Sequence, residues 1–398
     1  MMIAPENIKS KARRRIDRRS FLHRAAQSVA AGLCMPVFFG DHFRWPTRYG
    51  DTQTTKSTFV PEYRLLGRTS LELSTVGYGA MRTRDPAIIH RAIDLGVNYI
   101  DTAHSYMDGY NEVVVGKVLK SRRKETYVAT KVHIGSADRM MASVEASLKS
   151  LNTDYVDIIQ LHDLKSVSQL RDEGALGVLQ KVKEEGKARF VGFTTHRNQI
   201  ELLRAAAQMD VYDMILVAYN FKSPDELGSV IHHTADAGIG IVAMKTQAGG
   251  YKSHRMGNAS PHQAALRWVL QSPGVTAAIP SMVTHAQLEE DIRAMGTRMG
   301  WMDRKTLHRY GQAIDPQFCR MCDACRGGCP QDVDVFNVNR ALMYADGYRD
   351  AKLAMDTYRQ ISRSRKPDAC LVCRQCLVRC RYGLNVHEKM KRAAAIFT

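Results

Sequence analysis

Short apolar runs alternate with amphipathic segments between residues 59 and about 295 of this 398-residue chain. The runs are rich in β-branched residues, which is typical of buried strands, and the segments between them have a helical spacing of apolar positions. Strands that alternate with helices predict a parallel sheet. Eight such strands are enough to close a barrel. We therefore expect an α/β fold, a (β/α)8 TIM barrel, over residues 59–296. The predicted strands are STVGYGA, VNYIDTA, TYVATKV, VDIIQLH, ARFVGFT, MILVAYN, GIGIVAMK and TAAIP.

The pattern changes in the last hundred residues, 297–398, which we expect to form a small, mainly helical domain. Helix formers dominate MDRKTLHRYGQAI and VNRALMYADGYRDAKLAMDTYRQIS. Eight of the nine cysteines of the chain lie here, in two copies of the spacing C-x2-C-x2-C-x3-C. They are Cys319, Cys322, Cys325 and Cys329, then Cys370, Cys373, Cys376 and Cys380.

This cysteine spacing indicates iron–sulfur chemistry. It places three thiolates on one tight loop and sends the fourth toward another cluster, so we expect two [4Fe–4S] clusters and an electron-carrying role. Structural zinc usually takes separated C-x2-C pairs, which fits this spacing poorly. A disulfide framework would need an oxidising compartment and gives no reason for one spacing to occur twice. The ninth cysteine, Cys34, is interpreted as a small apolar residue.

The formal net charge is +17, and the basic excess lies in the first 24 residues and in 297–398. Because the barrel region is nearly neutral, the charge alone does not indicate nucleic-acid binding, and no basic aromatic-rich motif supports it. We expect no nucleic-acid partner. A cationic surface near the clusters would steer an acidic redox partner protein to them, or it is only a solvated face; both interpretations stay open.

The first 40 residues read as a targeting leader. Arg18-Arg19-Ser20-Phe21-Leu22 precedes the apolar stretch AAQSVAAGLCMPVFFG, which is too short to span a membrane. This arrangement resembles a twin-arginine export signal. The resemblance implies a periplasmic or otherwise exported protein that meets the membrane only at the export machinery. A disordered basic arm is the alternative, and residues 41–58 read as a linker.

Polar residues gather where successive predicted strands end. Asp101 ends the second strand, Tyr106 follows it, Lys131 lies at the end of the third strand, and His162 follows the fourth. The carboxyl-terminal strand ends carry the active site in TIM barrels. The order of these four residues along the predicted strands resembles that of the active-site residues in the aldo-keto reductase family. The resemblance covers roughly 62–293 and includes YRLLGRTSLELSTVGYGAM, DTAHSYMDGYNE, GIGIVAMK and ALRWVLQSPGVTAAIP.

The resemblance implies a role for each of the four residues. Tyr106 would be the general acid that protonates the alkoxide formed when hydride reduces a carbonyl. Lys131 would lower the pKa of Tyr106 from its ordinary value of about 10, Asp101 would hold Lys131, and His162 would orient the carbonyl.

The resemblance also implies a nicotinamide cofactor, NAD or NADP. Its implied contacts are Thr194, Thr195, Tyr219, Lys245, Ser281, Gln287 and Asp291. The chain departs from the family here, because the two cations expected after Ile279-Pro280 are missing, Asp291 is acidic, and Leu216 stands where a glutamine is usual. NAD(H), NADP(H), a tightly held cofactor or no nucleotide all stay open.

Two functions remain from these patterns. The first is an exported iron–sulfur oxidoreductase that interconverts a small-molecule carbonyl and an alcohol and passes electrons through two clusters. The long interval between the cysteine motifs resembles a helical two-cluster ferredoxin domain, and this implies that the last cysteine of each motif ligates the cluster of the other. The alternative is an electron-transfer subunit whose barrel is a non-catalytic binding scaffold.

Overall fold

A computed structural model describes residues 59–250 and 260–397. The predicted leader 1–40, with its paired arginines and Cys34, and the linker 41–58 lie outside the described residues. The described residues all belong to one compact unit. In these two ranges, no helix has the length and apolar character needed to cross a membrane.

Eight parallel strands form one sheet, in the same order as in the sequence. Val76 pairs with Ala278, and this parallel bridge brings the two outer strands together. The strands are β3 (Tyr78–Gly79), β4 (Tyr99–Asp101), β5 (Tyr127–Val132), β6 (Val156–Leu161), β7 (Ala188–Thr195), β8 (Met214–Ala218), β9 (Gly240–Met244) and β10 (Val275–Ala278). The predicted α/β fold of TIM type is confirmed, and each predicted strand overlaps an observed one.

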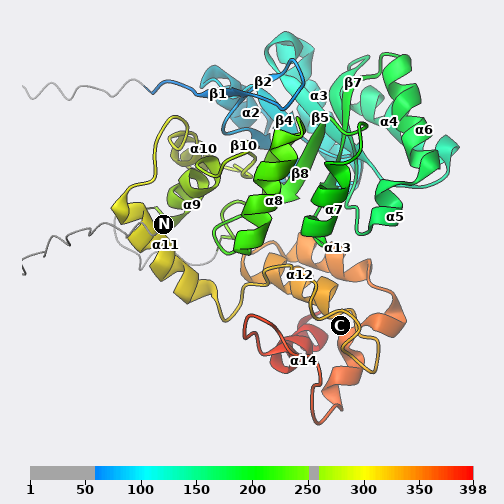
Figure 1. Ribbon diagram of the computed structural model, residues 1–398, viewed down its shortest axis with the longest axis vertical. Helices are drawn as coiled ribbons and strands as arrows, with labels where there is room; N and C mark the ends of the chain where they lie inside the picture. Colours follow the sequence, from blue (N-terminus) through cyan, green and yellow to red (C-terminus); the bar gives the residue numbers. More distant parts are fainter. Residues whose placement is uncertain (1–58, 251–259, 398) are drawn as a thin grey trace, which may run out of the picture. The chain divides into compact units, whose positions relative to one another are not determined.

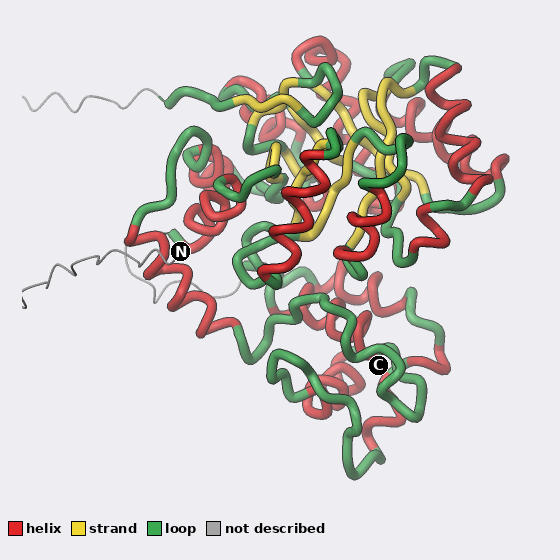
Figure 2. The backbone as a smooth tube through the Cα atoms, in the orientation of Figure 1, coloured by secondary structure: helices red, strands yellow, loops and turns green. Residues whose placement is uncertain are grey.

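Helices cover the outer face of this sheet (Figure 1, Figure 2). Several begin at side chains that accept a hydrogen bond from a backbone N–H of the first turn, as Asp85, Asp172 and Ser260 do. The helices are α2 (Pro86–Asp94), α3 (Tyr110–Arg122), α4 (Ala137–Leu151), α5 (Val167–Leu170), α6 (Glu173–Glu184), α7 (Gln199–Ala206), α8 (Asp225–Asp236), α9 (Pro261–Leu270) and α10 (His285–Ile292).

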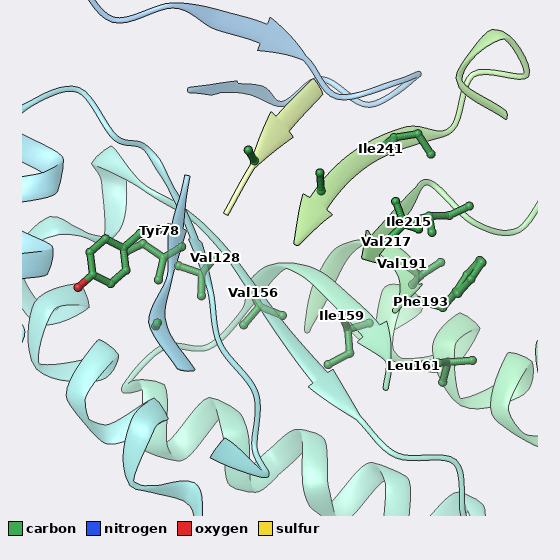
Figure 3. Packing of buried hydrophobic residues seen from close by; sticks show 14 of the residues in the cluster. Tyr78, Val128, Val156, Ile159, Leu161, Val191, Phe193, Ile215, Val217 and Ile241 are labelled. Carbon is green, nitrogen blue, oxygen red and sulfur yellow. The ribbon is translucent and has the colours of Figure 1, made fainter. Parts of the chain in front are cut away.

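Side chains of each strand alternate between two apolar layers. One layer lies between sheet and helices and includes Val128, Ile159 and Val217 (Figure 3). The other fills the barrel interior, where Leu66 and Leu71 enter from the hairpin of β1 (Tyr63–Leu65) and β2 (Glu72–Ser74).

Close packing holds this hairpin against the barrel. A Cβ at Gly67 would lie 2.3 Å from the backbone nitrogen of Gly240, and Gly67 has a φ of +50°. Only glycine fits such an approach without displacing the backbone. The hairpin therefore closes the amino-terminal end of the barrel.

The tail, defined as residues 297–397, consists of helices and loops, with no strand in this described range. Its helices are α11 (Trp301–Ile314), α12 (Val335–Asp346), α13 (Ala351–Arg359) and α14 (Val386–Ile396). The first cysteine motif lies between α11 and α12, and the second lies between α13 and α14. Apolar side chains of α12, such as Val338 and Leu342, belong to the same buried cluster as Met244 and Ile279 of the barrel.

Candidate active site

Three neighbouring strands bring the four predicted catalytic residues together. Asp101 is the last residue of β4, Lys131 lies in β5, and His162 directly follows β6. Tyr106 begins a short 3-10 helix, Tyr106–Gly109, after β4. The grouping follows from parallel pairing, because neighbouring parallel strands end at the same edge of the sheet.

Lys131 is fixed by two short hydrogen bonds. Its Nζ donates to Oδ1 of Asp101 at 2.5 Å and to the carbonyl oxygen of Thr102 at 2.5 Å. The other carboxylate oxygen of Asp101 accepts from Nε2 of Gln160 at 3.0 Å. Burial lowers the pKa of Lys131, and the neighbouring Asp101 opposes that shift. Lys131 and Asp101 are therefore one buried, charge-compensated unit.

Tyr106 lies between this buried pair and His162. The Nζ of Lys131 is 4.9 Å from the centroid of the Tyr106 ring, and the Tyr106 and His162 rings meet edge to face at 5.9 Å. His162 stacks on His133 at 4.5 Å, and its Nδ1 lies 3.4 Å from Oγ of Ser105. Burial lowers the pKa of His162 well below its usual value, and the charge of Lys131 lowers it further. The imidazole is therefore neutral at physiological pH, as a hydrogen-bonding partner of a carbonyl should be.

One expectation for Tyr106 is wrong in this structure. The sequence predicts that Lys131 lowers the pKa of Tyr106. Instead the pKa lies well above 10, chiefly because of burial and then because of the charges of Asp101 and Tyr344. Asp101 compensates the Lys131 charge at 2.5 Å, so little net charge remains to favour the phenolate.

A cavity of about 590 Å³ opens at this end of the barrel. Asp101, Tyr106 and His162 line it, with Lys131 buried behind them. The tail also contributes to the lining, through Arg340, Tyr344, Tyr348, Asp350, Lys352, Leu353, Asp356, Thr357 and Gln360 from α12, α13 and the adjoining loops. The tail therefore forms part of the cavity wall, which the sequence did not predict.

Polar contacts fasten this wall to the barrel. Arg340 NH1 donates to Oδ2 of Asp163 at 3.4 Å, and Oδ1 of Asp163 lies 2.7 Å from Nδ1 of His196. Arg82 Nε donates to Asp350 at 3.2 Å. Burial would raise the pKa of Asp163, but the charges of Arg340 and His196 hold it well below the usual value. Asp163 is therefore an ionised carboxylate at the boundary between barrel and tail.

The predicted nucleotide contacts separate into two groups. Lys245, Ser281, Gln287 and Asp291 line the cavity. Thr194, Thr195 and Tyr219 do not line the cavity, and their hydroxyl groups form hydrogen bonds with neighbouring residues instead.

Tyr219 faces the helix layer because of strand alternation. Its ring packs on Trp268 at a centroid distance of 5.1 Å, and its hydroxyl lies 3.2 Å from Oγ of Ser272. The contact with the cofactor that the family resemblance implies for Tyr219 is therefore not possible in this arrangement. Thr194 Oγ1 accepts from the backbone N–H of Asp163, and Thr195 Oγ1 donates to the carbonyl of Leu164, so both hold a loop rather than face the cavity.

Two acidic residues mark the side of the cavity formed by α10. Glu290 and Asp291 line it, and the chain from Ile279 to Asp291 contributes no Lys or Arg. Asp291 accepts a hydrogen bond from Gln247 at 2.7 Å, and burial raises its pKa well above the usual value. Glu290 accepts a hydrogen bond from Ser260.

Sequence reasoning missed Gln160 and the tail residues of the cavity. Gln160 left a usable signal, because it is a polar residue within the apolar run IIQL, and it is fully buried in the structure. Arg340, Tyr344 and Tyr348 recur at intervals of four, which places them on one side of a helical segment. That pattern indicates a polar face, but it does not say which surface the face covers.

The eight tail cysteines are free thiols that fall into two sets. Burial raises the pKa of Cys319 to about 12, and the charges of Cys325, Cys322 and Cys380 add to the rise. Burial likewise raises the pKa of Cys370 to about 11, with Cys329, Cys376 and Cys373 adding to it. Each set thus combines the first three cysteines of one motif with the last cysteine of the other.

The donor chemistry of these sets suits iron–sulfur clusters. Soft thiolates are the ligands of such clusters, and the backbone N–H of Tyr382 already lies 3.4 Å from Sγ of Cys380, as an amide donor to a ligand sulfur would. Within 59–250 and 260–397, no group of three or more His, Cys, Asp or Glu side chains is close enough to hold a single metal ion. The four corners of a cubane lie further apart than the ligands of one ion.

Residues 76–258 match the model of the Aldo/keto reductase family. L-galactose dehydrogenase of Arabidopsis thaliana is 28% identical over 304 residues, which are 64% of this chain and 95% of that protein. Methylglyoxal reductase DkgB of Escherichia coli O157:H7 is 26% identical over 253 residues, which are 60% of this chain and 92% of that protein.

Solved structures show the same similarity. An aldo-keto reductase from Bacillus halodurans in its holo form aligns with a TM-score of 0.55 at 23% identity, covering 63% of this chain and 96% of that one. A thermostable aldo-keto reductase in complex with the inhibitor epalrestat aligns with a TM-score of 0.53 at 26% identity, covering 63% of this chain and all of that one.

Proposed function

We propose that the aldo/keto reductase domain at residues 76–258, which makes this chain an oxidoreductase, interconverts a small-molecule carbonyl and its alcohol in the cavity lined by Tyr106. One observation carries the proposal: Asp101, Tyr106 and His162 line one cavity, with Lys131 fixed behind them by Asp101 at 2.5 Å. A proton donor, a neutral imidazole and a buried charge pair are the groups that carbonyl reduction requires beside a hydride donor.

Each residue has a definite task in this scheme. Tyr106 holds a proton, because its raised pKa keeps it a phenol, and gives that proton to the developing alkoxide. Neutral His162 orients the carbonyl oxygen by donating a hydrogen bond. The Lys131–Asp101 pair fixes the electrostatic environment of Tyr106 without adding net charge. The tail wall limits access of water to the cavity, which strengthens every electrostatic contact within it.

The cavity residues fit a nicotinamide cofactor, which would supply the hydride. The volume of the cavity, about 590 Å³, is typical of ligand sites, and Lys245, Ser281 and Gln287 offer polar groups that could bind the cofactor. Glu290 fits a ribose hydroxyl better than a 2′-phosphate, because a carboxylate accepts a hydrogen bond from a hydroxyl and repels a phosphate. The proposal therefore favours NAD(H) over NADP(H).

The tail is proposed to hold two [4Fe–4S] clusters, as in a two-cluster ferredoxin. The mixed cysteine sets around Cys319 and Cys370 support it, since they match the crossed arrangement that the spacing implies. The clusters would exchange single electrons with an acidic redox partner protein, attracted by the basic tail. The arginine pair at Arg18 and Arg19 supports export by the twin-arginine route to the periplasm or beyond.

A scaffold function is the second candidate, and one observation favours it. Thr194, Thr195 and Tyr219 lie outside the cavity lining, so part of the expected nucleotide site is missing. In that case the barrel binds a partner or ligand without chemistry, and the protein acts only as an electron-transfer subunit.

Titration of the anaerobically purified full-length protein with NADH and with NADPH separates the two functions. Nicotinamide fluorescence reports binding, and turnover is measured with methylglyoxal and benzaldehyde for reduction and with L-galactose and benzyl alcohol for oxidation. The oxidoreductase proposal predicts binding, turnover with at least one of these substrates, and loss of that turnover in Tyr106→Phe with the unfolding midpoint unchanged. Absence of nucleotide binding, or full turnover by Tyr106→Phe, would overturn it.

A further inference from the structure

Tyr344 occupies an unusual position in the cavity wall. It lies in α12, is only 2% exposed, and lines the same cavity as Tyr106. Its hydroxyl oxygen accepts a hydrogen bond from Nζ of Lys245 at 2.7 Å and another from Nε of Arg340 at 3.3 Å. Two cationic donors therefore converge on one phenol oxygen.

The surroundings of Tyr344 favour its anionic form. Lys245 comes from the loop after β9, and Arg340 lies one turn earlier on α12; both also lie against the ring, at 4.6 and 5.9 Å from its centroid. Two further phenols face Tyr344, namely Tyr348 at a ring distance of 5.2 Å and Tyr106. The carboxylate of Asp163 lies behind Arg340, which donates to it at 3.4 Å. Burial raises the pKa of Tyr344, but Arg340 and Lys245 outweigh burial and lower it to about 8.

The pKa of Tyr106, which lines the same cavity, is shifted in the opposite direction. Burial and the charges of Asp101 and Tyr344 raise its pKa well above 10. Tyr106 is half-buried. Its raised pKa disfavours loss of its proton, although turnover requires Tyr106 to change protonation state once per cycle. Two groups whose environments push their pKa values apart form a natural acid–base pair.

We propose that Tyr344 is the proton relay of this active site, exchanging a proton with Tyr106 while Lys245 and Arg340 hold its oxygen. In alcohol oxidation, the O–H bond of Tyr106 breaks and an O–H bond forms on the phenolate of Tyr344, directly or through one water. In carbonyl reduction the same bonds change in reverse, as microscopic reversibility requires. No electrons move in this step, and the proton then passes between Tyr344 and water that enters the cavity lined by both tyrosines. The relay rests on the proposed carbonyl–alcohol chemistry at Tyr106.

Spectroscopy tests the ionisation without any substrate. The full-length protein is titrated from roughly pH 6 to pH 10 while ultraviolet difference spectra record phenolate formation. In wild type a first phenolate should form with a midpoint near pH 8, before the tyrosines of ordinary pKa ionise at about pH 10; Tyr344→Phe should lack this first phenolate, and Tyr348→Phe should keep it. Tyr348 is the matched control, because it lines the same cavity and burial raises its pKa. A phenolate that persists in Tyr344→Phe would overturn the assignment.

Kinetics then test the relay itself. Benzyl alcohol oxidation by wild type should rise as pH passes about 8, and benzaldehyde reduction should fall over the same interval, since each direction uses one protonation state of Tyr344. Tyr344→Phe should lose both pH limbs and about a hundredfold in rate. Unchanged pH profiles in Tyr344→Phe would overturn the relay alone. Failure of wild type to turn over either substrate would overturn the proposed function and the relay with it.

Discussion

Arg340 of the tail donates to Asp163 of the barrel at 3.4 Å, although 177 positions separate them in the sequence. Both side chains are largely buried, at 16% and 14% exposure, and Asp163 also contacts His196. This ion pair ties α12 to the residue that follows the candidate catalytic His162. The tail is thus part of the wall of the candidate active-site cavity rather than a separate attachment.

Arg340→Met should destabilise the protein by about 3 kcal/mol, because it leaves the buried carboxylate of Asp163 without its main counter-charge. Urea unfolding midpoints measure the effect. Arg359→Met is the matched control, since Arg359 is 70% exposed and pairs with Asp356 on the surface, where such a pair contributes about 0.5 kcal/mol. Adding Asp163→Asn to Arg340→Met should recover part of the loss; equal midpoints for Arg340→Met and Arg359→Met would contradict this account.

The neutral state of His162 predicts a pH profile. Burial and Lys131 lower the pKa of His162, so the imidazole is uncharged at neutral pH and gains a proton only when the pH falls well below the usual histidine value. The kcat/KM for benzaldehyde reduction should therefore stay level through about pH 6.5, where an unperturbed histidine titrates. A limb at that pH that disappears in His162→Gln would show that His162 titrates normally.

The two cysteine sets predict which substitutions abolish which of the two proposed clusters. Cys380→Ala should lose the cluster assigned to Cys319, Cys322 and Cys325, whereas Cys329→Ala should lose the other. Each variant should retain about half of the iron and one of two cluster signals in electron paramagnetic resonance of the reduced protein. Cys34→Ala should retain all of the iron. If Cys380→Ala disturbed the same signal as Cys370→Ala, the crossed arrangement would be excluded.

The acidic side of the cavity predicts nucleotide preference. Glu290→Gln should weaken discrimination against NADPH by about tenfold relative to NADH, since removing one charge near a 2′-phosphate relieves roughly 1.4 kcal/mol of repulsion. Nicotinamide fluorescence titrations give both dissociation constants. Glu289→Gln is the control, because Glu289 precedes Glu290 in α10 but does not line the cavity. Tighter binding of NADPH than NADH by wild type would be inconsistent with this assignment.

The sequence was sufficient for the barrel and for the grouping of Asp101, Tyr106, Lys131 and His162. Strand periodicity and parallel order determine both, because neighbouring parallel strands present their ends at the same edge. The cysteine spacing was likewise a local signal. These features depend on residues close together in the chain or on adjacent strands.

Contacts between distant segments could not be predicted in the same way. Tyr219 was expected to contact the cofactor. Instead Tyr219, which directly follows β8, packs in the same outer layer as Val217, while Leu216 and Ala218 face the barrel interior. That register was readable from strand alternation. The packing of α12 against the cavity could not be predicted from the sequence, because it depends on which surface the polar face of Arg340, Tyr344 and Tyr348 covers.

Deuterium transfer measures the central claim most directly. Wild type and Tyr106→Phe are incubated anaerobically with methylglyoxal and benzaldehyde and with NADH that carries deuterium at its transferable position, and products are analysed by mass spectrometry. The account predicts deuterium on the carbinol carbon of at least one product with wild type, and a loss of about a hundredfold or more with Tyr106→Phe. Alcohol product without deuterium, or equal labelling by the two proteins, would contradict it.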